Sequence, residues 1–186
     1  MSNKQLSIKT ATLLSLIGIP RGAEIHQFDL KFLSSFDDRD VFELKGTVKN
    51  VREGERPKPI VVHSHEEDPQ LCPVRCLKEY ICMTAPWRKE GEPSALFLSY
   101  ISPHKPITKS RVAGWLKEAL LLAEVDTKVF QAHSFRGAAS SKALVKGLSV
   151  KEVVQHGNWS RESTWQRFYH REVQYPTKKF QDSLLN

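Results

Sequence analysis

Residues 132–139 contain two side chains whose types and spacing suit chemistry at a phosphate group. His133 and Arg136 lie three residues apart at the expected start of a helix. This spacing places both on one helix face, beside main-chain N–H groups that have no partner inside the helix. A guanidinium and an imidazole there can bind a phosphate and stabilise the extra negative charge of its pentavalent transition state. The pair alone is weak evidence, because His-x-x-Arg on a helix is usually a surface coincidence.

A second motif follows further along the chain. Residues 157–160 read Gly-Asn-Trp-Ser, and residues 163–171 form an expected helix that contains Tyr169. A tyrosine hydroxyl is a possible nucleophile, but its ordinary pKa of about 10 makes an activating base necessary, and His133 is a candidate for that role. Simpler interpretations exist as well, with Trp159 as a core residue and Tyr169 as an interface aromatic.

These motifs resemble those of a known family. The order His-x-x-Arg, short helix, Gly-x-Trp turn and tyrosine-bearing helix is similar to the C-terminal half of the tyrosine recombinase (phage integrase) family. The Gly-Asn-Trp-Ser form and the run Phe-Tyr-His-Arg at residues 168–171 resemble most the eukaryotic recombinases of DIRS-type and Crypton-type mobile elements. The resemblance covers residues 10 to 171.

The resemblance also implies site residues in the first half of the chain. The family places an arginine followed by x-x-Glu after an opening helix, where this chain has Arg21 and Glu24. Glu24 would hold Arg21 in place. A catalytic lysine on a β-hairpin corresponds to Lys45, with Lys49 as the fallback. Each has a plain alternative, since Arg21 could be a solvated residue after a proline turn and Lys45 an exposed hairpin lysine.

The implied reaction is phosphoryl transfer without a cofactor. Tyr169 would attack a DNA phosphate, leaving a 3′-phosphotyrosyl link and a free 5′-hydroxyl. The hydroxyl of a second strand would then attack the phosphotyrosyl link and reverse the reaction. Arg136 is expected to stabilise developing charge and not to act in packing. Two guanidiniums and an imidazole can do what paired metal ions do elsewhere, so neither metal nor cofactor is implied. The implied catalytic residues are Arg21, Lys45, His133, Arg136, Trp159 and Tyr169.

The tyrosine spacing departs from the commonest bacterial pattern, in which the nucleophile lies nine residues after the His/Trp position. Here Phe168 stands nine residues after Trp159, and Tyr169 stands ten residues after it. One residue rotates a helical side chain by about 100°, so the turn at residues 160–162 is expected to absorb the extra residue. Tyr175 is the other candidate nearby, but Pro176 biases it toward an extended tail.

The partners and rivals follow from the same resemblance. Double-stranded DNA is the expected partner, with a possible homo-oligomer on DNA, and the expected location is intracellular, or nuclear if the source is eukaryotic. One rival is a type IB topoisomerase-like nicking and closing enzyme. Another is a catalytically silent DNA-binding module derived from a mobile element. Residues 1–186 are interpreted as a single catalytic domain, without the N-terminal core-binding domain that clamps DNA in the family.

Composition agrees with a single globular domain that binds a polyanion. The 186 residues are 40% hydrophobic and 26% charged, with a net charge of +7 and a pI near 9.4. A basic surface attracts nucleic acid, although charge alone is weak support. Cys72, Cys76 and Cys82 form an odd set whose spacing matches no zinc pattern, so we predict a reducing compartment and no structural metal. The apolar run 11–19 imitates a signal peptide but ends in Pro-Arg and is too short to span a bilayer.

These residues must be positioned by a mainly α-helical fold with a small antiparallel β-sheet (α+β) of about three strands. Apolar spacing predicts helices at residues 7–17, 22–32, 73–83 and from Thr108 onward. β-Branched runs at residues 40–48 and 60–63 predict a hairpin, and residues 95–98 a short strand. Three shorter helices are expected at residues 134–146, 150–155 and 163–171, the second with a capped entry at Ser149.

Overall fold

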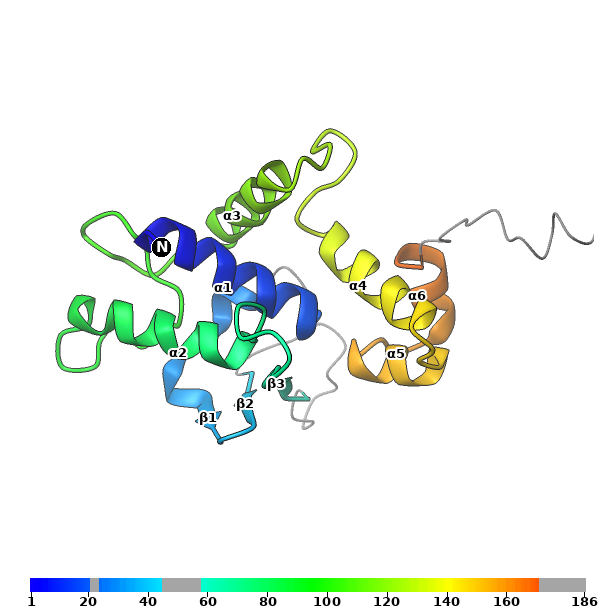
Figure 1. The fold of residues 1–186 in the computed structure, drawn as a ribbon, viewed down its shortest axis with the longest axis horizontal. Helices are drawn as coiled ribbons and strands as arrows, with labels where there is room; N and C mark the ends of the chain where they lie inside the picture. The colour runs from blue at the N-terminus through cyan, green and yellow to red at the C-terminus, as the bar shows by residue number, and fades with distance from the viewer. Residues whose placement is uncertain (21–23, 45–57, 171–186) are drawn as a thin grey trace, which may run out of the picture.

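The computed structural model describes residues 1–20, 24–44 and 58–170. Within these ranges the fold is mainly helical with one small antiparallel sheet, which confirms the predicted class (Figure 1). Most predicted helix positions are confirmed to within a few residues. The helices are α1 (Asn3–Ile17), α2 (Pro73–Thr84), α3 (Lys109–Leu122), α4 (Ser134–Val145), α5 (Val150–His156) and α6 (Glu162–Phe168).

The helix ends follow local sequence signals. The Thr108 side chain accepts a hydrogen bond from the Arg111 N–H at 3.3 Å and so begins α3. Ser149 and Glu152 form a reciprocal capping box at the start of α5, as predicted from the sequence. Such caps fix where α3 and α5 begin.

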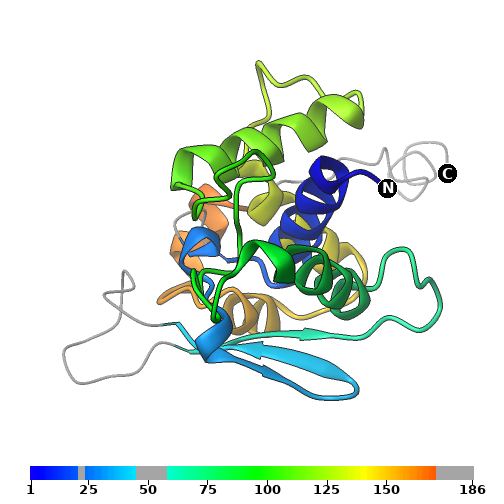
Figure 2. The same ribbon diagram turned by 90° about the vertical axis from the view of Figure 1, so that its left-hand side faces the viewer.

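The sheet has three strands within the described residues: β1 (Leu33–Ser35), β2 (Arg39–Phe42) and β3 (Ile60–His63). Their order is β1-β2-β3, and both pairs are antiparallel. Figure 2 shows the sheet along one face of the helical body. The connection between β2 and β3 contains Lys45 and Lys49, which lie outside the described residues.

The helix predicted at residues 22–32 is wrong. The described part of this segment holds two short 3₁₀ turns, Ile25–Gln27 and Leu30–Phe32, separated by extended backbone at Phe28. The Phe28 ring stacks on Phe42 of β2 with centroids 4.4 Å apart and is 2% exposed. The Asp29 side chain accepts a hydrogen bond from the Lys31 N–H at 2.8 Å, which starts the second turn. Tertiary packing and a local cap therefore override the helical spacing.

The strand predicted at residues 95–98 is also wrong, because only isolated bridges form there, between Asp29 and Ala95 and between Leu98 and Pro106. The Arg88 guanidinium donates hydrogen bonds to three main-chain carbonyls of this region, those of Pro93, Ala95 and Leu96. A side chain thus satisfies backbone groups that a neighbouring strand would otherwise pair.

Buried apolar side chains form two separate clusters. The main core joins α1, α2 and α3 with the sheet, and it includes Leu14, Tyr80 and Trp115. One face of α3 packs on this core, with Val112, Trp115 and Leu116 buried and Ala119 and Leu120 partly buried against it. A second, smaller cluster lies under α4, α5 and α6, on the right in Figure 1. Its buried members are Ile19, Val153, Trp159 and Trp165.

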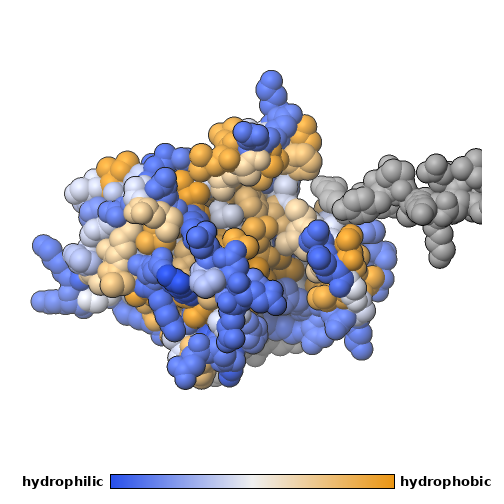
Figure 3. All heavy atoms as spheres, viewed as in Figure 1, coloured by the Kyte–Doolittle hydropathy of each residue, from blue (hydrophilic) through white to orange (hydrophobic). Residues whose placement is uncertain are grey.

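On the face drawn in Figure 3 hydrophilic residues alternate with apolar areas, some of which lie over α3 and the loop that follows it. Exposed large apolar residues there are Leu121, Leu122, Val129 and Phe130. Cys72, Cys76 and Cys82 are free thiols. Over the residues that the structure describes, no helix combines the length and apolar character needed to cross a membrane.

Candidate active site

Arg136 lies at the centre of the site, in the first turn of α4. Its side chain is buried, with 5% of the residue exposed. The Nη1 group donates to the main-chain carbonyl of Ile19, and Nη2 donates to that of Gly157. Arg136 therefore connects the end of α1 to the turn after α5. The expectation that Arg136 has no packing role is wrong, because two buried carbonyls depend on it.

Trp159 covers the guanidinium of Arg136. The Arg136 Cζ lies 4.0 Å from the centroid of the Trp159 ring, a cation–π arrangement. Trp159 is 7% exposed, and its indole N–H has no hydrogen-bond partner among the described residues. Buried tryptophan N–H groups usually find an acceptor. The arrangement thus places the face of an aromatic ring over a buried cation.

The turn that positions the Trp159 side chain over Arg136 depends on Gly157. A Cβ built on Gly157 would lie 1.8 Å from Cζ3 of Trp159, so the indole ring occupies the space of a side chain there. Asn158, which follows, adopts the left-handed conformation with φ at 51°. Asparagine tolerates this region better than most residues. The Gly-Asn-Trp sequence is therefore explained by a sharp turn that folds the indole back onto its own backbone.

We expect Gly157→Ala to push Trp159 off Arg136. The added methyl group cannot coexist with the ring, so the free energy of unfolding should fall by about 1–3 kcal/mol or more. Chemical denaturation followed by tryptophan fluorescence measures this. Gly114→Ala is the matched control, because a Cβ at Gly114 in α3 meets nothing within 4 Å. Equal stability of the two variants would contradict the close contact described here.

Tyr169 completes the cluster from a third segment. It stands at the C-terminal cap of α6, and its ring contacts Trp159 with centroids 5.1 Å apart. The Arg136 Cζ lies 5.4 Å from the Tyr169 ring centroid. Phe168, in contrast, is 57% exposed. The residue ten positions after Trp159 therefore faces the arginine, and the residue at nine positions faces solvent.

The extra residue is accommodated at both ends of α6. Arg161, just before the helix, is extended, as expected for the turn at residues 160–162. Tyr169 itself also leaves helical geometry, with φ at −125° and ψ at −27°. The Trp165 carbonyl accepts hydrogen bonds from the N–H groups of both Tyr169 and His170, at 2.8 and 3.0 Å. This widened last turn rotates the tyrosine toward the pocket.

His133 lies on the other side of Arg136 from the Gly157 turn. It precedes α4 and is exposed. With Lys109, Arg136 and Tyr169 it lines a pocket of about 320 Å³. His133, Arg136 and Tyr169 thus share one concavity, as the motif predicts. Lys109, from the first turn of α3, was not identified from the sequence, where one lysine among many carries no signal.

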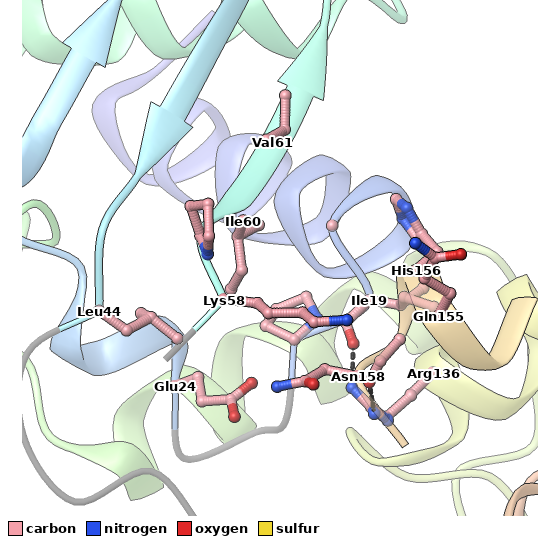
Figure 4. Close-up of a pocket in the computed structure, with 14 residues that line it drawn as sticks. Ile19, Glu24, Leu44, Lys58, Ile60, Val61, Arg136, Gln155, His156 and Asn158 are labelled. Atoms are coloured by element: carbon pink, nitrogen blue, oxygen red, sulfur yellow. Dashed lines mark hydrogen bonds between the residues drawn. The ribbon is translucent and has the colours of Figure 1, made fainter. Parts of the chain in front are cut away.

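A second pocket of about 300 Å³ lies between the Gly157 turn and the start of β3 (Figure 4). Glu24 is buried there, with 8% exposed, and its carboxylate points toward Asn158. The Lys58 side chain extends into the same pocket, toward Ile19. Arg136 lines both pockets and so connects them. Lys58 was not predicted from the sequence, because the motif points to a lysine after β2, at Lys45 or Lys49, whereas Lys58 lies just before β3.

Three predicted residues cannot be placed. Arg21, Lys45 and the fallback Lys49 lie outside the described residues, so their proximity to Arg136 stays a prediction. Pro20, which precedes Arg21, and Leu44, which precedes Lys45, both line the second pocket. Of the predicted residues that are described, Arg136, Trp159 and Tyr169 are in contact, and His133 and Glu24 line the adjoining pockets.

Comparison of the chain with known protein families identifies the family to which it belongs. Residues 2–174 match the model of the phage integrase family, which is nearly the whole chain. The chain belongs to the phage integrase family. No curated protein sequence is significantly similar to it.

Solved structures show the integrase fold over almost the full chain. The XerH site-specific recombinase bound to its difH substrate in a pre-cleavage complex is 13% identical, with a TM-score of 0.68 over 99% of this chain and 48% of that one. The XerA recombinase is 16% identical, with a TM-score of 0.64 over 98% and 64%. The Tn1549 transposon integrase in complex with transposon right-end DNA is 16% identical, with a TM-score of 0.58 over 95% and 58%. The chain thus spans between about half and two thirds of these integrases.

Proposed function

We propose that this chain is a tyrosine recombinase catalytic domain that cuts and rejoins DNA through a covalent phosphotyrosine. The observation that carries the proposal is the contact of the Tyr169 ring with the buried Arg136 guanidinium and with the Trp159 ring, from three segments of the chain. Membership of the phage integrase family supports it. A nucleophile, a cation and a donor at one place match the needs of phosphoryl transfer.

The reaction assigns a role to each group. The Tyr169 oxygen attacks phosphorus, its proton passes to His133, and the bond from phosphorus to the 5′-oxygen breaks. Arg136 and Trp159 donate hydrogen bonds to the non-bridging oxygens as negative charge develops. The leaving 5′-oxygen takes a proton from a lysine. Attack by another 5′-hydroxyl reverses these steps and rejoins the strands, so no nucleotide is consumed.

The remaining roles rest on residues outside the described ranges. Arg21 would supply the second guanidinium, with Glu24 holding it from the pocket wall. Lys45 is the proposed acid, with Lys49 as the fallback. Lys58 adds a positive charge to the same pocket and is a further candidate for contact with a phosphate.

DNA is the proposed partner. The net charge of +7 favours a polyanion, and Lys58 and Lys109 line the two pockets that meet at Arg136. We propose assembly of several copies on DNA, because strand exchange needs more than one cleaved strand. The Gly-Asn-Trp-Ser turn and the Phe-Tyr-His-Arg run favour a DIRS-type or Crypton-type origin and hence a nuclear location.

A nicked suicide DNA tests the proposal. Such a substrate loses a short fragment after cleavage, so rejoining fails and the adduct accumulates. Candidate sites come from sequence flanking the gene. Denaturing electrophoresis should show a labelled DNA strand that migrates with the protein until protease is added. DNA binding without any adduct would support the silent module instead, and relaxation of supercoiled plasmid without strand exchange would support the topoisomerase-like rival.

A further inference from the structure

The main-chain carbonyl of Tyr169 rests directly on α4. A Cβ built on Gly137 would lie 3.0 Å from this carbonyl oxygen, closer than nine in ten real contacts of that kind, so the carbonyl would have to shift by a few tenths of an ångström. The Ser141 hydroxyl donates to the same oxygen at 3.4 Å. Gly137 and Ser141 are four residues apart and so lie on one face of α4. One provides the space for the carbonyl, and the other provides a donor.

The peptide N–H of Tyr169 is anchored separately. It donates to the Trp165 carbonyl at 2.8 Å. Trp165 is 1% exposed, and its indole N–H donates to the Ser140 hydroxyl at 3.0 Å. Ser140 in turn donates to the Gly137 carbonyl at 3.1 Å. Both sides of Tyr169 are therefore tied to α4, the helix that also presents Arg136.

This anchoring matters because the helix itself does not fix the tyrosine. Tyr169 stands at the cap of α6 with non-helical dihedrals, beyond the last residue of the helix. Its ring direction then depends on where its main chain is held. A shift of the nucleophile by about 1 Å can slow a reaction about 100-fold.

We propose that Gly137 and Ser141 are positioning residues for Tyr169, holding its carbonyl against α4 so that its hydroxyl faces Arg136 of the same chain. The inference rests on the proposed function of Tyr169 as the nucleophile. The proposal also gives a reason for a glycine at position 137, directly after Arg136. Any larger residue at Gly137 displaces the tyrosine backbone without removing a catalytic group.

The test compares Gly137→Ala with Gly114→Ala in the full chain. Both change a helical glycine to alanine, but only the first methyl group meets the tyrosine. At saturating suicide DNA, the rate constant for adduct formation should fall about 10-fold to 100-fold in Gly137→Ala. DNA affinity should stay within about twofold, because no proposed DNA contact is removed. Gly114→Ala should match the parent chain in both quantities. Ser141→Ala should lower only the rate constant, and by less.

Fluorine NMR of chains labelled with fluorotyrosine gives a readout that needs no activity. The Tyr169 resonance is assigned from its loss in Tyr169→Phe, and that of the fully buried Tyr80 reports on the intact main core. In Gly137→Ala the Tyr169 resonance should move while that of Tyr80 stays. An unmoved Tyr169 resonance, or an unchanged rate constant, would overturn the positioning role. A parent chain that forms no adduct while its Tyr169 resonance responds to Gly137→Ala would instead overturn the proposed function.

Discussion

Tyr169→Phe is expected to eliminate the covalent adduct between protein and DNA. The substitution removes one oxygen atom and leaves the ring that contacts Trp159, so the fold and DNA affinity should remain. Without the hydroxyl the proposed nucleophile is lost, and the rate of adduct formation should fall at least about 10³-fold. Suicide DNA with denaturing electrophoresis measures the adduct, and a filter-binding titration measures the affinity.

Tyr175→Phe is the matched control for this prediction. Tyr175 lies outside the described residues, and Pro176 follows it in the sequence. Adduct formation should continue at the parent rate. An adduct that persists in Tyr169→Phe and disappears in Tyr175→Phe would reassign the nucleophile. Persistence in both variants would reject the phosphotyrosine mechanism.

Arg136→Ala should abolish the adduct and also destabilise the fold. Loss of the guanidinium removes charge stabilisation, for which about a 10²-fold to 10³-fold lower rate is expected. It also leaves the Ile19 and Gly157 carbonyls without their donor and uncovers Trp159. Each of the two buried carbonyls without a partner costs about 1–3 kcal/mol, so the free energy of unfolding should fall by about 2–6 kcal/mol. Urea denaturation gives the free energy of unfolding. The suicide DNA assay, run under conditions in which the variant stays folded, gives the rate of adduct formation.

Two further variants separate these effects. Arg136→Lys keeps the charge but cannot reproduce two divergent guanidinium donors, so it should recover part of the stability and little of the rate. Arg75→Ala removes one positive charge from an exposed pair with Glu79 and should change stability by less than about 1 kcal/mol. An Arg136→Ala chain as stable as Arg75→Ala would contradict the buried position of Arg136.

Much of the fold was predictable because its signals are local. The caps at Thr108 and Ser149 and the apolar face of α3 depend on residues within a few positions of one another. The segment at residues 22–32 failed because Phe28 is held by Phe42, on a strand of the sheet. The periodicity of apolar residues contains no information on such a contact, and the contact overrides the helical pattern.

The site shows the same division between local and distant causes. The motif identified Arg136 and Tyr169, yet it gave no sign that Arg136 is buried, since its carbonyl partners are 117 and 21 residues away along the chain. The spacing of Tyr169 predicted a compensating turn before α6. It did not predict the second adjustment, at Tyr169 itself, where the main-chain carbonyl lies against Gly137, 32 residues earlier in the chain.

Because the two hydrophobic clusters are separate, the smaller cluster, against which Tyr169 packs, can open while the main core stays folded. Phe135 on α4 belongs to the main core, whereas Trp159 and Trp165 belong to the smaller cluster that supports Tyr169. A small cluster opens at a lower free energy than the main core unfolds. Such an opening would loosen the contact of Tyr169 with Arg136 while α1, α2 and α3 stay folded. A polyanion that contacts both parts would bind the closed arrangement and, by mass action, stabilise the contact of Tyr169 with Arg136.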